Sequence, residues 1–521
     1  MTVNTIRNLL ERAADYYPQK TALIEKKEKV SYKELLKRVN KIAKFLNTLP
    51  LKKGDRIGIY SNKCINQVIS ILSVLSTDFV IVPITRFYKP DQLKHIIKDC
   101  DIKCIITDKT KIKNVKEVNF EGKIISFEPI EKEIVSFEEI LKCYDDNYAC
   151  DVKSHANAVI TYSYATHSFA KGIVISHRNL TDGARIVSKY LDIKKEDVIS
   201  GVLSFNLDYG LNQIFCALYN KATLAIHKYM LASDFFNHLI NDKVTILPVM
   251  PIHISQMFDE DPHKIPRGEF LKNIRAVTSS GGNLTAKMIK DIQTHFPNAK
   301  FYSMHGLTEA FRSTYLDPSQ INIRPNSIGK AVPDVEIYVI NENKEECKPR
   351  EVGELIHRGA CIYKGYWNAP EETAKRFKSI KILEKVLDLE GDLIDETVVA
   401  SGDYVYKDEE GYLYFVSRKD DMIKTRGYRV SPYEIESVVY DNISEIKQCA
   451  VFGVENEKIE EEIVLVYSAQ KPIPKNSILF ELKKHLPTYM LPSIIVYKEY
   501  IPLQYGKMDK EKLKKEVLKT L

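Results

Sequence analysis

The sequence predicts an α/β protein, with a large N-terminal domain of stacked, mostly parallel sheets and helices and a small, mobile α+β C-terminal domain. Three observations support this fold class. The chain has 521 residues, several times the ~100–200 of a typical domain. Its opening third alternates strand and helix patterns, as parallel sheets covered by helices do. After residue 417 the pattern changes to a shorter unit that is able to bury a core of its own.

The elements of the opening third follow from periodicity. Ser31 and Glu34 have the spacing of a capping box, and apolar residues then recur at helical period up to Leu46. Short β-branched runs at 56–60, 79–84 and 104–107 alternate with helical patterns such as 90–99, and similar strand signals recur at 223–227, 244–248 and 275–279. The most apolar stretch, 68–84, is interrupted by polar residues and falls short of the ~20 apolar residues of a membrane span. An amphipathic helix followed by a buried strand is the better interpretation, and no membrane span is predicted.

The C-terminal region predicts a separate domain. Residues 411–416 have the pattern of an edge hairpin, and a polar run follows at 418–421. Beyond it we expect strands at 448–454 and 462–468 and helices at 431–440 and 477–486. The predicted domains are therefore 1–419 and 420–521, with a hinge at about residue 420.

Composition excludes several classes of protein. Lys and Arg number 76 against 70 Asp and Glu, a formal charge of +6 that is too small and too dispersed for a nucleic-acid-binding protein. The nine cysteines are irregularly spaced, which suits neither a disulfide framework nor a zinc site, so buried free thiols are expected. The first twenty residues carry charges throughout and have no apolar signal core. We expect a cytoplasmic protein.

A first motif lies at 161–172, directly after an apolar strand. It is a loop of small and hydroxyl residues that ends in Lys171 and Gly172, and such a loop can hold a polyphosphate. Ser163, Thr166 and Lys171 are its candidate ligands. Taken alone, the segment is more typical of a surface turn.

Two further motifs follow predicted strands. Gly281, Gly282 and Asn283 permit the close approach of a planar ligand; the alternative is a tight turn in which Asn283 or Thr285 caps the next helix. The segment 305–309 places a flat ring, a hydroxyl and a carboxylate close together. These groups suit base stacking, a phosphate contact and a magnesium ligand, although a solvated loop has the same composition.

Two motifs lie later in the chain. Asp403 is able to accept both hydroxyls of a ribose, as acidic residues do in dinucleotide sites. Arg418 lies in the polar run that follows. Lys507, in the segment Gly506-Lys507-Met508-Asp509, would be solvated surface if it stood alone.

In this order and spacing the segments resemble the adenylate-forming superfamily, which comprises acyl-CoA synthetases, luciferase and the adenylation domains of nonribosomal peptide synthetases. The resemblance runs from about Ser31 to Asp509. It includes the segments Val352-Gly353-Glu354-Leu355, Lys364-Gly365-Tyr366-Trp367, Asp421-Met422-Ile423-Lys424 and Gly427-Tyr428-Arg429-Val430.

The resemblance implies an ATP-dependent, AMP-forming ligase. A carboxylic acid attacks the α-phosphate of ATP, and a thiol of coenzyme A or of a phosphopantetheine carrier protein then displaces AMP. It also implies Mg²⁺ and assigns roles by position. Lys507 bridges carboxylate and phosphate, Thr308 contacts phosphate, and Glu309 binds Mg²⁺. His305 and Gly306 lie at the adenine, Asp403 binds ribose, and Arg418 contacts the nucleotide. Asp420 is the hinge, and the Gly427 loop replaces Lys507 during thiol transfer.

Two positions bear on activity and substrate. The phosphate loop of the family is glycine-rich, but here Ala165 and Ser168 occupy glycine positions, which predicts a stiffer loop. Asp208 matches the aspartate that binds the α-ammonium group of an amino acid in peptide synthetases. The alternative role for Asp208 is to cap the helix that follows it. The expected substrate is a small carboxylic or amino acid. The alternative function is a non-catalytic nucleotide- or acyl-binding homologue with a degenerate phosphate loop.

Overall fold

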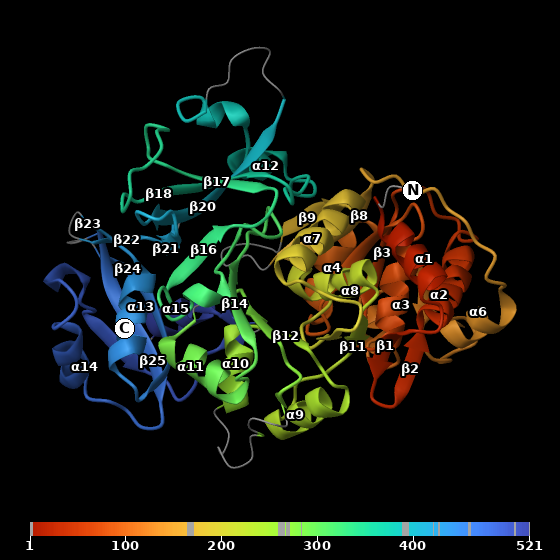
Figure 1. Ribbon diagram of the computed structural model, residues 1–521, viewed down its shortest axis with the longest axis horizontal. Coiled ribbons are helices and arrows are strands. Elements are labelled where there is room, and N and C mark those ends of the chain that lie inside the picture. Colours follow the sequence, from red (N-terminus) through yellow and green to blue (C-terminus); the bar gives the residue numbers. More distant parts are fainter. Residues whose placement is uncertain are drawn as a thin grey trace.

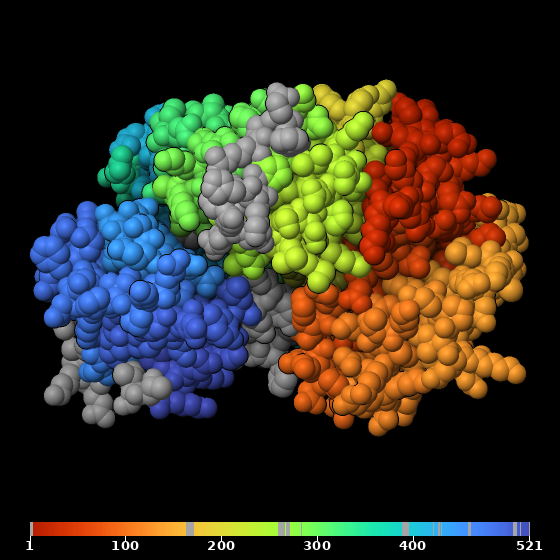
Figure 2. Space-filling view, turned by 90° about the horizontal axis from the view of Figure 1, so that it is seen from below, coloured from red at the N-terminus to blue at the C-terminus, as the bar shows by residue number. Residues whose placement is uncertain are grey.

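A computed structural model describes residues 4–163, 171–258, 266, 271–282, 284–387, 395–419, 421–425, 428–456, 460–504 and 507–519. The N-terminal part and the C-terminal unit lie at opposite ends of the molecule, and the middle of the chain lies between them (Figure 1). Figure 2 shows the C-terminal unit, in blue, as a separate lobe beside the rest of the chain.

The first sheet is built from the N-terminal strands in the order β7-β6-β5-β3-β4-β8-β9. Its neighbouring strands are parallel except for β8 and β9, as the strand–helix alternation predicts. The strands are β3 (Arg56–Tyr60), β4 (Val80–Ile84), β5 (Ile102–Thr107), β6 (Lys123–Ser126), β7 (Val135–Ser136), β8 (Asn157–Ser163) and β9 (Lys171–Ser176).

The second sheet has the order β17-β18-β20-β21-β16-β15-β14-β13-β12-β10-β11-β1-β2, with β19 pairing β20. It is parallel from β1 to β14 and antiparallel from β14 to β17. Its parallel half is β1 (Thr21–Glu25), β10 (Val198–Ser200), β11 (Thr223–Ala225), β12 (Ile246–Val249), β13 (Ala276–Ser279) and β14 (Lys300–His305), with β2 (Glu28–Ser31) antiparallel at the edge. Its antiparallel half is β15 (Thr314–Tyr315), β16 (Ser327–Ala331), β17 (Val335–Ile340), β18 (Gly353–Gly359), β19 (Phe377–Ser379), β20 (Thr397–Lys407) and β21 (Leu413–Arg418).

The α/β class is confirmed. The hairpin expected at 411–416 is present, because β20 and β21 pair antiparallel across the turn between Lys407 and Leu413, but its predicted place at the edge of a sheet is wrong. Strand β21 pairs with β20 on one side and with β16 on the other, so it lies inside the sheet. The Ser327 hydroxyl also donates to the Leu413 carbonyl at 2.8 Å. Strand β16 is more than eighty residues earlier in the chain, so no local pattern reveals this pairing.

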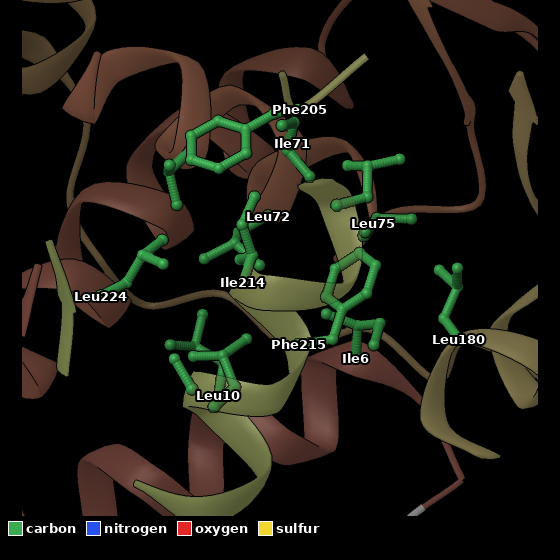
Figure 3. Close-up of a cluster of buried hydrophobic side chains, with 14 of the residues drawn as sticks. Ile6, Leu10, Ile71, Leu72, Leu75, Leu180, Phe205, Ile214, Phe215 and Leu224 are labelled. Atoms are coloured by element: carbon green, nitrogen blue, oxygen red, sulfur yellow. The ribbon is translucent and has the colours of Figure 1, made fainter. Parts of the chain in front are cut away.

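Helices lie between and around the two sheets. The core cluster drawn in Figure 3 joins α1, α3 and α8 to residues of the second sheet such as Leu224, and the same cluster includes Ile57 and Ile59 of the first sheet. The helices of this part are α1 (Ile6–Tyr16), α2 (Tyr32–Leu46), α3 (Ile65–Val74), α4 (Pro90–Asp99), α5 (Ile112–Glu117), α6 (Phe137–Cys143), α7 (His177–Tyr190), α8 (Asp208–Asn220), α9 (Ala232–Asn241), α10 (Pro251–Phe258), α11 (Ala286–His295) and α12 (Pro370–Arg376), with short 3₁₀ turns at η3 (Pro318–Gln320) and η4 (Ile380–Leu383).

Local sequence explains several helix starts. Ser31 caps α2 through a bond from the Glu34 amide, and Ser176 and Asn179 form a capping box at α7. Pro90 stands at the start of α4, where its missing N–H is not needed. In the described part of the chain, no helix has the length and apolar character that crossing a bilayer requires. The cysteines are free thiols, as predicted, and most are buried.

The C-terminal unit has a sheet of its own, in the order β23-β22-β25-β24, with β26 on β25. The described residues form two apolar clusters here, and every buried member of both lies beyond residue 422. These clusters support the proposed boundary near residue 420; Asp420 itself lies outside the described residues. The elements are β22 (Ile423–Thr425), β23 (Tyr428–Val430), α13 (Pro432–Asn442), β24 (Ile446–Asn456), β25 (Glu460–Ala469), α14 (Lys475–Leu482), η5 (Thr488–Met490), β26 (Ile494–Tyr497), β27 (Leu503–Gln504), β28 (Lys507–Met508) and α15 (Lys510–Leu518).

Candidate functional site

Three predicted nucleotide ligands meet where β14, β20 and β21 run together. Asp403 on β20 and Arg418 on β21 are direct partners in the antiparallel ladder, and Arg418 Nη1 donates to Asp403 Oδ1 at 2.8 Å. His305, the last residue of β14, lies with Nε2 3.0 Å from Asp403 Oδ2. Residues almost a hundred positions apart therefore form one polar cluster.

The cluster holds its carboxylate in the ionised form. Asp403 is 2% exposed, and burial alone would raise its pKa. The hydrogen bond and charge of His305 and the charge of Arg418 outweigh burial, so the pKa of Asp403 lies below its ordinary value. Burial opposes the charged form of Arg418 as well, but Asp403 and Glu309 raise the pKa of its guanidinium.

The segment after β14 carries two more of the predicted ligands, Thr308 and Glu309. Thr308 is exposed, whereas Glu309 is buried, 3% exposed, and accepts a short hydrogen bond from the Tyr366 hydroxyl. Burial and the charge of Glu309 raise the pKa of Tyr366, so its hydroxyl remains a donor. Gly306 is fixed by a close approach, because a Cβ there would lie 2.6 Å from the Phe311 carbonyl oxygen.

The segment around Tyr366 is joined to strand β9. The Val174 amide donates to the Gly365 carbonyl at 2.9 Å, and the Trp367 amide donates to the Gly172 carbonyl at 2.7 Å. Sequence reasoning recognised residues 364–367 as a family segment but assigned them no role. In this structure they carry the hydroxyl donor of Glu309 and anchor it beside strand β9.

The phosphate-loop prediction falls partly outside the described residues. Ser163 ends β8 and is the ladder partner of Lys171, the first residue of β9, while Thr166 lies outside the described residues. Lys171 Nζ donates to Glu372 Oε2 at 2.7 Å, and this bond is the main reason why the pKa of Glu372 falls to about 2. Sequence reasoning missed Glu372, because nothing local links α12 to this loop.

The glycine segment after β13 forms a turn into α11. Gly281 has a positive φ of 86°, and a Cβ on Gly282 would lie 3.2 Å from Pro251. Thr285 is the N-cap of α11, and its hydroxyl accepts a hydrogen bond from the Met288 amide at 3.2 Å. The prediction that Asn283 or Thr285 caps this helix is therefore confirmed for Thr285. Asn283 lies outside the described residues.

Asp208 lies in the first turn of α8, directly after the N-cap residue Leu207. Its Oδ1 accepts from the adjacent Tyr209 amide at 2.6 Å, but it is the first residue of the helix and not its N-cap, and among the described residues no side chain caps α8, so the capping alternative is not confirmed. Burial raises the pKa of Tyr363, and the charge of Asp208 raises it further. The Asp208 carboxylate therefore also acts on the interior of the molecule.

Arg312 is a site residue that sequence reasoning missed. It is 3% exposed, its Nη1 donates to Ser280 Oγ at 3.2 Å, and its guanidinium lies 4.9 Å from the centre of the Tyr209 ring. It follows Glu309 by three residues and sits beside the glycine turn. The sequence offers no signal for it, since an arginine in a polar loop is normally exposed.

The C-terminal unit contributes Lys507 through a two-residue ladder, in which Lys507 pairs with Gln504. The neighbouring residues Leu503 and Met508 line a cleft of about 1450 Å³ that Gly281 and Gly282 also line. The segment of Lys507 thus borders the same cleft as the glycine turn. Gly427 and Asp420 lie outside the described residues.

Comparison with known proteins gives the family. The AMP-binding enzyme family matches residues 10–367. Tyrocidine synthase 1 of Brevibacillus parabrevis is 24% identical over 516 residues, covering 98% of this chain and 45% of the relative. Gramicidin S synthase 1 of Brevibacillus brevis is also 24% identical, covering 98% and 44%. The chain spans less than half the length of these two relatives.

Solved structures share the fold across the whole chain. ATP-bound MatB from Rhodopseudomonas palustris superposes with a TM-score of 0.86 at 22% identity, covering 98% of both chains. The anthranilate CoA ligase AuaEII in complex with anthranoyl-AMP gives 0.85 at 20% identity, covering 99% of this chain and 98% of that one. The o-succinylbenzoate CoA synthetase of Bacillus subtilis in complex with its acyl-adenylate gives 0.83 at 20% identity, covering 97% of both. The match to more than half of this chain, together with the polar cluster at β14, β20 and β21, shows that the protein belongs to the AMP-binding enzyme family of adenylate-forming proteins.

Proposed function

We propose that this protein is an AMP-forming ligase, which activates a carboxylic acid with ATP and passes the acyl group to a thiol. The observation that carries the proposal is the buried Asp403 carboxylate, held ionised between His305 and Arg418. An ionised carboxylate with two free lone-pair directions accepts the paired hydroxyls of a ribose.

The nucleotide roles follow from this anchor. His305 ends β14 beside Asp403, where its imidazole would stack on adenine. Gly281 and Gly282 would leave room for the base, and Asn283 is assigned to the same segment by its position in the sequence. Ser163, Thr166, Lys171 and Thr308 would contact the phosphates, and Arg418 the nucleotide. Each assignment is made by position in the family pattern.

The donor set fits one Mg²⁺ ion. Among the described residues no group of three or more His, Cys, Asp or Glu side chains forms a metal cage. Glu309 offers a single buried carboxylate oriented by Tyr366, and Mg²⁺ is commonly held by one or two carboxylates together with substrate phosphates. When bound, the ion would neutralise phosphate charge.

In the proposed reaction, the substrate carboxylate oxygen forms a bond to the α-phosphorus while the bond to pyrophosphate breaks. Lys507 would stabilise the negative charge that develops between the two groups. In the second step a thiol sulfur attacks the acyl carbonyl and AMP leaves. Rotation about Asp420 would exchange Lys507 for the Gly427 loop between the steps, as domain closure does in other enzymes. The acceptor is coenzyme A or a phosphopantetheine carrier protein, and Asp208 would bind an α-ammonium group if the acid is an amino acid.

One observation favours a second candidate, a non-catalytic nucleotide- or acyl-binding homologue. The ammonium of Lys171 is engaged by Glu372, and the loop before it carries Ala165 and Ser168 in place of glycines. A loop with Cβ atoms at these positions restricts the backbone that cradles phosphates.

Pyrophosphate exchange with a panel of carboxylic and amino acids tests the proposal. We expect exchange with at least one acid, and a loss of roughly 10²–10³ in rate for Lys507→Ala. Lys512→Ala on the exposed face of α15 is the matched control and should exchange like the wild type. Equal exchange by Lys507→Ala would remove Lys507 from the mechanism, and AMP binding without exchange for any acid would favour the second candidate.

A further inference from the structure

Arg312 is a buried cation with few partners. Its side chain comes from the segment after Glu309 and is 3% exposed. Its one hydrogen bond among the described residues is from Nη1 to Ser280 Oγ at 3.2 Å, and its buried Nε has no acceptor. No carboxylate of the described residues lies within ion-pair distance of it. Buried guanidinium groups are normally paired, because an uncompensated buried charge is strongly unfavourable.

Aromatic rings hold the guanidinium in place. Its carbon lies 4.9 Å from the centre of the Tyr209 ring and 4.6 Å from that of Phe311. Tyr209 is itself fixed, since its hydroxyl lies 2.7 Å from Thr278 Oγ1. Cation–π contacts orient an arginine but leave the donors at its edge available.

The position of Arg312 places it beside the nucleotide ligands and within reach of the acid. No hydrogen bond of the described residues joins it to His305, Asp403 or Arg418, but Gly306 lies next to it, since a Cβ there would be 3.6 Å from Arg312 Nη1. Arg312 also contacts Ser280 and the ring of Tyr209, the residue that follows Asp208 at the start of α8. It thus lies on the side of the site where Asp208, the proposed ammonium ligand, begins α8.

We infer that Arg312 binds a second anionic group of the substrate, so that the acid activated here carries a carboxylate at its far end. This inference rests on the proposed function and names its substrate class. An arginine edge with an unused Nε matches a carboxylate in a bidentate, charge-assisted pair. The far carboxylate would supply a charge partner that Arg312 does not find among the described residues.

Binding of non-reactive acyl-adenylate analogues tests the inference directly. The probes are sulfamoyl adenosines acylated with succinate, glutarate or adipate, each as the free distal carboxylate and as its methyl ester, with affinity measured by calorimetry. For at least one chain length we expect the wild type to bind the free carboxylate about 100-fold more tightly than the ester, because the ester leaves the buried cation unpaired. Arg312→Met should lose this preference, and Arg312→Lys should retain part of it.

Controls separate a binding role from a structural one. Arg350→Met removes an arginine that is 67% exposed and paired with Glu409, and it should bind every probe like the wild type. Without ligand, Arg312→Met should melt no lower than the wild type, since an apolar side chain replaces an unpaired charge. If Arg312→Met fails to fold, comparing the affinities for free carboxylates and esters in the wild type and in Arg312→Lys still tests whether Arg312 binds the distal carboxylate.

The failure of this inference is distinct from the failure of the proposed function. Equal affinity of the wild type for free carboxylates and esters at all three lengths overturns the role of Arg312, while AMP binding and pyrophosphate exchange with a monocarboxylic acid leave the ligase proposal standing. If neither AMP nor any probe binds, both are overturned.

Discussion

At the residue scale, the site depends on charges that only function together. Asp403 is buried, and without His305 and Arg418 burial would favour its neutral form. Arg418 in turn is held charged by Asp403 and Glu309. Each side chain would be costly alone in this environment, and the three are stable as a group because every charge has a partner.

This mutual dependence gives a pH prediction for Asp403→Asn. Because the pKa of the Asp403 carboxyl is lower in the folded state, the carboxylate stabilises the folded protein at pH values above the ordinary Asp pKa of about 3.9. This stabilisation is lost as the pH falls through the pKa of the folded state. We expect the wild type to exceed Asp403→Asn by about 1–3 kcal/mol in unfolding free energy at pH 7, because the variant leaves Arg418 poorly compensated.

Urea unfolding of both proteins from pH 8 to pH 3 measures this difference. It should not shrink between pH 8 and 5, and it should decline only below about pH 4. A difference that is already lost at pH 5 would mean that the Asp403 carboxyl is not held ionised by its neighbours.

At the scale of elements, the site is assembled by loops that brace one another across long distances in the chain. The segment 364–367 pairs with β9 and carries Tyr366 to Glu309. Gly365 makes this possible, since it has a φ of 115° and its missing Cβ would lie 2.7 Å from Thr373 Cγ2. A side chain there meets both backbone strain and a collision.

We therefore expect Gly365→Ala to lower the unfolding free energy by about 1–3 kcal/mol and to reduce pyrophosphate exchange at least tenfold, because it displaces the donor of Glu309. Gly411→Ala is the matched control, with a positive φ of 80° but open space around its Cβ. It should lose less stability and keep its exchange rate. Similar losses in the two variants would assign the effect to backbone strain alone.

At the scale of the whole molecule, two parts with separate apolar clusters meet near residue 420. The C-terminal unit touches the larger part through β21, where the Ser431 hydroxyl donates to the Val416 carbonyl at 2.5 Å and the Tyr433 ring packs edge-on against Phe415 at 5.4 Å. A polypeptide connection near residue 420 is where a rotation of one part against the other would take place.

If the proposed rotation about Asp420 separates the two half-reactions, stiffening this position should affect only the second. Asp420→Pro is expected to keep pyrophosphate exchange within about threefold of the wild type and to slow thioester formation at least 100-fold, since proline fixes φ. Asp420→Ala is the control and should support both steps. Equal loss of both steps in the proline variant would argue against a hinge at this residue.

The sequence predicted a large share of the fold because burial leaves a periodic trace in each element. Helix α4 has the predicted bounds, Ser31 caps α2, and the strands near residues 56, 80 and 104 occur where β-branched runs predict them. The family resemblance is confirmed, and the structure brings together Asp403, His305 and Arg418, the residues that the resemblance assigned to the nucleotide.

Only the tertiary structure revealed which distant residues are partners. Three contacts join segments that are far apart in the sequence: the pairing of β21 with β16, the hydrogen bond from Tyr366 to Glu309 and the ion pair of Lys171 with Glu372. The burial of Arg312 likewise depends on which other segments cover its side chain. A local pattern records whether a side chain faces a core, because that is set within one helix or strand. It does not record which charged residue will lie next to that side chain, because this depends on the tertiary arrangement of the whole chain.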